Sequence, residues 1–195
     1  CTRIKQLAPA INMQMDAVFW LGKLYCAMKD YRKALAYFTR AIEITDTRRP
    51  DVHMALGVAY SNFGNVQQLL GNYKNALPAL QQAIEIFEKN FTPRIELALA
   101  YSYMGETHRK MGNYRAALDF FEKAKTIRKA LTPAQHPDLA ASYYDFAQVY
   151  KNTKQNKLAY EQSQKALEIA RHTLPEIHPD CVKYKQALTK MQVAK

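Results

Sequence analysis

Glycine and cysteine are both scarce in this chain of 195 residues, which contains six glycines and three cysteines. Cys1, Cys26 and Cys181 are widely spaced and odd in number, which argues against a disulfide framework and favours a reducing, cytoplasmic compartment. His, Cys and acidic residues show no recognised metal-ligand spacing. We therefore expect neither a metal site nor a cofactor.

Long apolar runs are also missing from the sequence. None approaches the roughly 18–20 residues that are needed to cross a bilayer, and no charged segment followed by an apolar core opens the chain as a signal peptide would. Neither a nucleophile elbow, nor a phosphate-binding glycine loop, nor a zinc-binding helix motif occurs. We expect a protein that is not an enzyme and does not insert into membranes. Because Cys1 and not Met opens the chain, we also expect it to be part of a longer protein.

Basic residues outnumber acidic ones, with 28 Lys and Arg against 17 Asp and Glu, so that the net charge is +11. Such an excess favours an acidic partner. The basic residues are spread along the chain in runs of no more than two, and arginines are not interleaved with base-stacking aromatics. These features favour an acidic protein or peptide as the partner and argue against nucleic acid.

A repeat of about 42 residues organises the chain. Residues of one type recur with spacings of 42, 41 and 42, which is the mark of a repeat architecture. The recurring sets are Ala34, Ala76, Ala117 and Ala159; Ala41, Ala83, Ala124 and Ala166; Gly22, Gly64, Gly105 and Ala147; and Tyr31, Tyr73, Tyr114 and Asn156. Large apolar residues between them follow the helical period. Each repeat is therefore predicted to be a pair of helices.

Small and large residues have predictable roles within each repeat. The Gly or Ala at the position of Gly22 would let the two helices approach closely, and Gly71 and Gly112 would supply a turn that needs a positive φ. The fourth repeat departs most from the pattern, since Ser163 stands where Phe38 and Phe121 stand in other repeats. Lysine occupies the turn-glycine position twice, at Lys29 and Lys154.

The first repeat shows the motif most clearly. Leu21-Gly22-Lys23-Leu24-Tyr25, then Tyr31-Arg32-Lys33-Ala34-Leu35, then Phe38-Thr39-Arg40-Ala41, resembles the tetratricopeptide repeat. The unit of 42 residues resembles the longer, kinesin-light-chain type. This resemblance implies an all-α, right-handed α-solenoid of antiparallel helical hairpins.

The repeat register predicts the division of the chain. Residues 13–50, 51–91, 92–134 and 135–174 would form four repeats. Residues 1–12 would be a lead-in segment or the end of a preceding repeat. Residues 175–195 would form a capping helix, or else the first helix of a fifth repeat, in which Cys181, Tyr184 and Leu188 lie on one side.

The histidines fit structural roles better than chemical ones. His136-Pro137-Asp138 recurs 42 residues later as His178-Pro179-Asp180, and proline followed by an acid suits the first turn of a helix. His108 stands where Tyr25 and Tyr150 stand in other repeats, so it should be a packing residue with a satisfied nitrogen and not a general base.

The resemblance also implies where a partner binds. In the family, ligand contacts come from first-helix positions around the Gly or Ala position, which line the concave side. Carried over residue by residue, these positions give a peptide-binding groove made of Trp20, Lys23, Asn62, Asn65, Gln68, Tyr103, Glu106, Arg109, Lys110, Tyr144, Asp145, Gln148 and Lys151.

This groove has a usable chemistry. Amide side chains can bond both the donor and the acceptor of an extended backbone, and aromatic side chains can anchor a partner. Arg109, Lys110 and Lys151 could hold a carboxylate, with Arg109 binding it through two parallel hydrogen bonds. We expect a scaffold or adaptor that binds an extended, acidic peptide segment of another protein. Two alternatives stay open: a structural solenoid that assembles through its ends or edges, including as a homo-oligomer, and a regulatory appendage of a larger enzyme.

Overall fold

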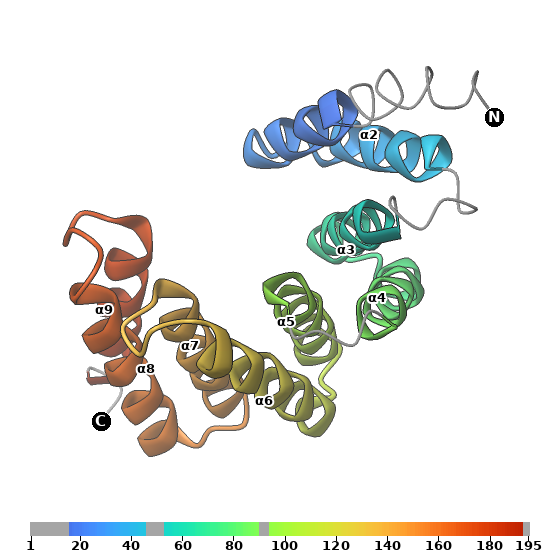
Figure 1. Ribbon diagram of the computed structural model, residues 1–195. Helices are drawn as coiled ribbons and strands as arrows, with labels where there is room; N and C mark the ends of the chain where they lie inside the picture. The colour runs from blue at the N-terminus through green and yellow to red at the C-terminus, as the bar shows by residue number, and fades with distance from the viewer. Residues whose placement is uncertain (1–15, 46–52, 90–93, 193–195) are drawn as a thin grey trace. The chain divides into compact units, whose positions relative to one another are not determined.

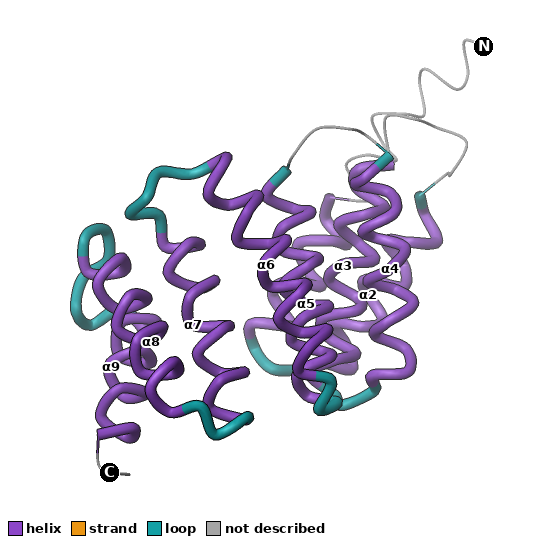
Figure 2. The backbone as a smooth tube through the Cα atoms, turned by 90° about the horizontal axis from the view of Figure 1, so that it is seen from below, coloured by secondary structure: helices purple, strands orange, loops and turns teal. Residues whose placement is uncertain are grey.

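Every regular element that the structure describes is a helix. The structure is a computed structural model that describes residues 16–45, 53–89 and 94–192, and no strand occurs in these ranges (Figures 1 and 2). A helix over 16–27 is followed by α2 (Tyr31–Ile44), α3 (His53–Leu69), α4 (Tyr73–Glu88), α5 (Ile95–Lys110), α6 (Tyr114–Leu131), α7 (Pro137–Asn152), α8 (Asn156–Arg171) and α9 (Pro179–Gln192). Among these helices, none has the length and apolar character needed to cross a membrane. The predicted all-α fold class is confirmed. Cys1 and the predicted lead-in segment lie outside the described residues.

The chain divides into two compact units, which are described separately. Unit 1 comprises Cys1–Thr92 and unit 2 comprises Pro93–Lys195. In unit 1, α2 packs against α3 and α3 against α4. In unit 2, each of the helices from α5 to α9 packs against the next one along the chain. The exact limits of the four repeats stay a prediction.

The two helices of each hairpin meet at the Gly or Ala position of the first helix. A Cβ atom added to Gly22 would lie 2.8 Å from Phe38, one added to Gly64 would lie 2.6 Å from Leu80, and one added to Gly105 would lie 2.7 Å from Phe121. These distances are too short for a real contact, so the large residue of the second helix occupies the space that a methyl group would fill.

The fourth hairpin exchanges both partners of this contact. Ala147 takes the place of the glycine, and Ser163 takes the place of the large residue. Both are fully buried, with none of their surface exposed. Ala147 adds one methyl group, and Ser163 is much smaller than Phe38, Leu80 or Phe121, so the fourth repeat combines two small residues at these positions. The Ser163 hydroxyl is buried without a hydrogen-bond partner.

The turn between the two helices of a hairpin is the same in all four cases. Gly71, Gly112, Lys29 and Lys154 have φ values of 78°, 82°, 62° and 60°, in the left-handed region. In each turn the next residue donates its N–H to the carbonyl five residues earlier, as Asn72 does to Gln67 at 2.9 Å and Gln155 does to Tyr150 at 2.8 Å. This is the Schellman arrangement, which satisfies the last carbonyls of a helix.

The two His-Pro-Asp segments begin helices, as predicted. α7 begins at Pro137 and α9 begins at Pro179. In each segment the histidine Nδ1 accepts a hydrogen bond of 3.2 Å from the backbone N–H of the aspartate, His136 from Asp138 and His178 from Asp180. The side chain thus satisfies a backbone donor at the start of the helix that no residue of the helix itself can satisfy.

The close contact of the hairpins predicts the effect of one methyl group. We expect Gly105→Ala to destabilise unit 2 by about 1–3 kcal/mol, because the new Cβ overlaps the ring of Phe121. Urea unfolding followed by circular dichroism measures this loss. In a Phe121→Ala background the same substitution should cost much less, and equal costs in both backgrounds would contradict the predicted clash.

The lysines in left-handed turns predict a gain in stability. We expect Lys154→Gly and Lys29→Gly each to raise the free energy of unfolding by up to about 1 kcal/mol, because glycine adopts positive φ without the Cβ clash that lysine suffers. Gly112→Ala, the reverse change at the equivalent position, should lower it. If thermal melts show that both glycine variants are less stable than wild type, lysine is not strained by the positive φ of these turns.

Candidate functional site

The residues predicted from the first repeat lie on the helix over 16–27. The Trp20 side chain is 64% exposed, and the Lys23 Nζ atom lies 4.6 Å from the centre of its indole ring. The two side chains form a cation–π pair on the surface. Trp20 thus presents a large aromatic surface, and part of it already contacts a cation.

The amides predicted from the second repeat are less available than the sequence suggests. Asn62 Nδ2 donates a 2.8 Å hydrogen bond to the carbonyl of Val58 in its own helix. Gln68 is buried, with 6% of its surface exposed, and Asn65 is half-buried. An extended backbone would therefore meet fewer free amide donors on α3 than the predicted groove supplies.

Arg109 on α5 is already paired within the protein. Its Nε and Nη2 atoms each donate a 2.6 Å hydrogen bond to one carboxylate oxygen of Glu106, one turn earlier. This bond is the main reason that the pKa of Arg109 is raised. Lys110 Nζ lies 3.9 Å from the same carboxylate. The forked geometry that we predicted for a partner's carboxylate is thus used by Glu106.

The third donor of Arg109 links α5 to α7. The Asn152 side-chain amide forms hydrogen bonds with both its oxygen and its nitrogen when its oxygen faces Arg109. In this orientation Arg109 Nη1 donates to the amide oxygen at 3.0 Å. The amide nitrogen then donates to the carbonyl of Gln148, also at 3.0 Å. Arg109 is therefore a structural bridge between two first helices, and a partner's acid would have to compete with Glu106 for it.

Charged side chains from three neighbouring helices act on the carboxyl group of Asp145 on α7. Burial raises the pKa of its carboxyl to about 7, although Arg128 on α6, Lys183 on α9 and Arg109 on α5 act to lower it. Glu106 on α5 acts in the same direction as burial. No hydrogen bond to this carboxylate is found among the described residues. Near neutral pH, Asp145 is therefore partly protonated.

Two tyrosines stand beside Asp145. The rings of Tyr144 on α7 and Tyr184 on α9 have centroids 4.8 Å apart, and Lys183 Nζ lies 4.4 Å from the centre of the Tyr144 ring. Burial raises the pKa of both phenols, so both stay neutral donors at physiological pH. We name the cluster formed by these residues the α5–α7–α9 face, in which Tyr184 and Arg128 are buried. Its members are Glu106, Arg109, Tyr144, Asp145, Asn152, Lys183, Tyr184 and Arg128.

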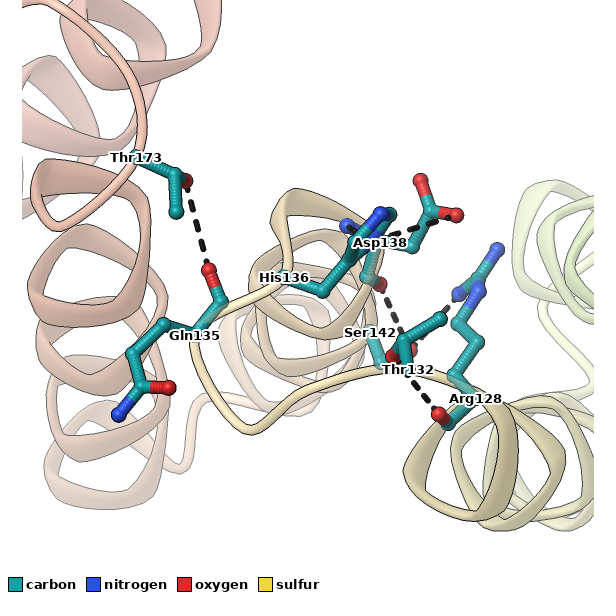
Figure 3. A network of polar contacts seen from close by, with 7 residues as sticks. All are labelled: Arg128, Thr132, Gln135, His136, Asp138, Ser142 and Thr173. Atoms are coloured by element: carbon teal, nitrogen blue, oxygen red, sulfur yellow. Dashed lines mark hydrogen bonds and ion pairs between the residues drawn. The ribbon is translucent and has the colours of Figure 1, made fainter.

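Arg128 is a functional candidate that sequence reasoning missed. It lies on the second helix α6, yet only 5% of its surface is exposed, and its side chain reaches Ser142 on α7 (Figure 3). Nη1 donates a 2.7 Å hydrogen bond to the Ser142 hydroxyl, which in turn donates to the carbonyl of Asp138 at 3.2 Å. Nε is buried without a hydrogen-bond partner. A buried guanidinium with an unused donor is costly unless an anion or water accepts from it.

The repeat register contains the signal that could have identified Arg128. The equivalent residues are Thr45, Phe87 and Ala170, all of which are buried. A charged residue at a position that is buried in every other repeat is a departure that packing alone does not explain. We restricted the predicted groove to first helices, so this departure was overlooked.

The remaining predicted residues of unit 2 have different surroundings. Tyr103 and Gln148 are half-buried, and their carbonyls accept hydrogen bonds from Thr107 and Asn152 respectively. Lys151 is exposed at the end of α7. The structure thus brings Glu106, Arg109, Tyr144 and Asp145 together, whereas Lys151 stands at the edge. Whether these residues bind a partner stays a prediction.

One expectation about the histidines was wrong. His108 packs as predicted, stacked on Phe120 with ring centroids 5.4 Å apart, but its Nδ1 atom is buried without a hydrogen-bond partner. Burial lowers the pKa of the imidazole, which therefore favours the neutral form. Phe120 lies parallel to the imidazole, with an interplanar angle of 7°, so it contacts the face of the ring and not the edge at which Nδ1 would form a hydrogen bond.

Solved structures of similar fold are found among helical repeat proteins. The crystal structure of BtubC (BKLC) from P. vanneervenii has a TM-score of 0.79 at 18% identity, with 99% of this chain and 78% of that chain covered. A putative kinesin light chain from Podosopora anserina with nearly identical TPR-like repeats has a TM-score of 0.71 at 17% identity, covering 93% of this chain and 86% of that one. At these identities the likeness shows the fold.

A third similar structure was solved with a ligand. The Rap protein complexed with Competence and Sporulation Factor has a TM-score of 0.78 at 14% identity, and the match covers 91% of this chain but 48% of that one. A search of the curated proteins finds no match.

The family follows from the sequence match and the fold together. The family model described as Tetratricopeptide repeat matches residues 13–89 and 96–172, which is most of the chain. The predicted resemblance, including that to kinesin-light-chain-like repeats, is confirmed. Repeats of this fold are interaction modules, and no catalytic family is indicated. The chain belongs to the tetratricopeptide repeat family.

Proposed function

We propose that this protein is a scaffold that binds an extended, acidic segment of a partner protein, and that the α5–α7–α9 face is the centre of binding. The observation that carries the proposal is the charge around Asp145. Three cations from three helices, Arg109, Arg128 and Lys183, act on a carboxyl that is partly protonated near neutral pH. The face is therefore positive where a partner would meet it.

Arg128 is the proposed contact for a partner's carboxylate. Arg109 already holds Glu106 through two hydrogen bonds, whereas Arg128 has a neutral hydroxyl as its hydrogen-bond acceptor and a buried Nε without one. A carboxylate placed against Arg128 would gain a charge-assisted hydrogen bond in surroundings of low dielectric constant. In this proposal Arg128, and not Arg109, binds the partner's acidic side chain. Lys183 and Lys151 are exposed and would contact further acidic groups of the partner.

The tyrosines supply the apolar part of the proposed site. Tyr144 is half-buried and lies against Tyr184, which is buried and holds the Tyr144 ring in place. The neutral Tyr144 phenol can donate a hydrogen bond to a peptide carbonyl. Aromatic side chains held in place by their neighbours are frequent anchors in interfaces. The Rap protein structure, which holds Competence and Sporulation Factor, supports the proposal by showing that a protein of this fold can hold a ligand.

Peptide selection on the full chain tests the charge preference. We expect peptides selected for binding to share at least one acidic position, and Lys183→Glu to weaken their binding by roughly tenfold, with a similar or smaller loss for Lys151→Glu. Lys129→Glu, an equal change in charge at an exposed position of α6, is the matched control and should have little effect. Arg128→Gln should remove the preference for acid at one peptide position.

The proposal has clear failures. Selected peptides without any acidic position would contradict it. Equal losses for Lys183→Glu and Lys129→Glu would mean that net charge alone drives binding, without a site on this face. Circular dichroism of each variant checks that the helices remain folded.

The raised pKa of Asp145 predicts a dependence on pH. Below about pH 7 the carboxyl is protonated and no longer repels a partner's acid, so affinity for acidic peptides should increase by up to roughly tenfold from pH 8 to pH 6. Asp145→Asn should bind as tightly at pH 8 as the wild type does at pH 6. Titrations by fluorescence anisotropy across this range measure both, and a variant that keeps the full pH dependence would exclude Asp145 as its source.

The same carboxyl also affects folding, with a sign that can be worked out. The pKa is higher in the folded protein than the ordinary value of 3.8, so the folded state retains a proton that the unfolded state loses. This contribution to stability is fully present below about pH 4 and is lost as the pH rises to about 7. Asp145→Asn should therefore stabilise the fold relative to wild type at pH 8 and should have a smaller effect at pH 4. Thermal melts of both proteins at pH 4 and pH 8 measure this difference.

A further inference from the structure

The loop that joins α6 to α7 begins with a threonine followed by a proline. Thr132 ends α6 with an extended backbone (φ −126°, ψ 152°), and Pro133 follows it. The three residues before Thr132 and the three after it, 129–131 and 133–135, are all exposed, and Thr132 itself is half-buried. An enzyme that acts on this hydroxyl can therefore reach the chain on both sides of it.

Thr132 lies next to a cation that is incompletely paired. Its Oγ1 atom donates a 2.7 Å hydrogen bond to the carbonyl of Arg128, and the guanidinium of the same arginine donates to Ser142 at 2.7 Å (Figure 3). Because Arg128 and Thr132 are four residues apart at the end of a helix, their side chains lie on the same side of it. The buried Nε of Arg128 has no hydrogen-bond partner. An anionic group attached to Thr132 would meet this unused donor.

The pairing of arginine with threonine is specific to the third repeat. The residues equivalent to Arg128 in the other repeats are Thr45, Phe87 and Ala170, and those equivalent to Thr132 are Arg49, Phe91 and Leu174. No other repeat therefore places a threonine four residues after an arginine at these positions. The packing of the hairpins does not require this pair of residues.

The end of α6 also suits a negative charge. A phosphate near the last carbonyls of a helix is normally repelled by the helix dipole. Here Arg128 and Lys129 both lie in the last turn of α6, so two positive charges offset this repulsion. A phosphorylated Thr132 would no longer donate to the Arg128 carbonyl, but its phosphate oxygens would gain stronger, charge-assisted hydrogen bonds.

We propose that Thr132 is a phosphorylation site for a proline-directed serine/threonine kinase, and that its phosphate occupies Arg128 in place of a partner's acid. In this reaction Thr132 Oγ1 attacks the γ-phosphorus of ATP, the bond from that phosphorus to the bridging oxygen breaks, and ADP leaves. The hydroxyl proton passes to the base of the kinase. The second half of the proposal rests on the proposed function, in which Arg128 binds an acidic segment.

Treatment of the folded full chain with a purified proline-directed kinase and ATP tests the site. The chain has one other Thr-Pro pair, Thr92-Pro93, so the parent chain for the experiment carries Thr92→Ala. We expect mass spectrometry to find one phosphate, on Thr132, and none after Thr132→Val. If the folded chain carries no phosphate on Thr132, the proposal is wrong. A synthetic peptide with the sequence of residues 126–138, treated in parallel, shows whether the sequence or the fold prevents the reaction.

The contact with Arg128 is measured without any partner. Phosphorus NMR follows the second ionisation of the phosphate, whose pKa should be lower in the parent chain than in Arg128→Gln, because the guanidinium favours the dianion. Lys129→Gln, which removes an exposed charge next to Arg128, should change this pKa less. Equal pKa values in the parent chain and Arg128→Gln would mean that the phosphate does not occupy Arg128. Arg128→Met replaces the Gln variant if circular dichroism shows that the latter unfolds.

Peptide binding tests the consequence for the partner. Phosphorylation should weaken the binding of acidic peptides by roughly tenfold and should remove the preference for acid at the peptide position that Arg128 contacts. In Arg128→Gln the phosphate should have a smaller effect. An unchanged affinity, or an equal loss in both chains, would overturn the regulatory role. If the unmodified chain selects no acidic peptides, the proposed function fails, whereas the kinase reaction and the NMR comparison still decide whether Thr132 is modified and contacts Arg128.

Discussion

The close approach of two helices at a residue without a side chain is the contact on which the hairpins depend. Gly22, Gly64 and Gly105 each leave room for one large residue of the second helix, namely Phe38, Leu80 and Phe121. The fourth hairpin has Ala147 and Ser163 at these two positions, both fully buried. Three of the four hairpins therefore pair a residue without a side chain with a large one, because a densely packed interface does not tolerate a clash. The fourth pairs two small residues, and its Ser163 hydroxyl is buried without a hydrogen-bond partner.

The hairpins also determine where charge can be placed. The helices α5 and α9 place Arg109 and Lys183 close enough to act electrostatically on Asp145 of α7. Arg128 of the second helix α6 acts on the same carboxyl. Arg109 stabilises the structure, because Glu106 and Asn152 accept from all three of its nitrogens. Arg128 is less completely paired, and Asp145 has a raised pKa. A polar network that is incompletely satisfied in the free protein is where a ligand can add most.

The two ends of the described chain differ in a way that follows from the repeat. At the C-terminal end, α9 covers α8 with Cys181 and Tyr184, which keep 3% and 2% of their surface, and it exposes Lys183, Lys185 and Lys190. At the other end, Leu24 stands exposed at a position where α3 and α7 bury a valine. Among the described residues, α9 therefore turns three lysines to solvent, whereas the first described helix exposes Leu24.

The sequence alone determined the family, the helical hairpins and the turns, because these depend on local spacing and on residues with few conformational choices. The recurrence of Gly, Ala and Tyr predicted the pairing of helices, and His-Pro-Asp predicted where α7 and α9 begin. Only the tertiary structure decided which groove residues are free. Glu106 lies one turn from Arg109, but the occupation of the Arg109 fork depends on side-chain geometry that spacing does not specify. The contact of Arg128 with Ser142 joins residues 14 apart on different helices, and the pKa of Asp145 depends on groups from α5, α6 and α9 together. Burial and electrostatics of this kind arise from how helices pack, so no pattern within a single repeat could have revealed them.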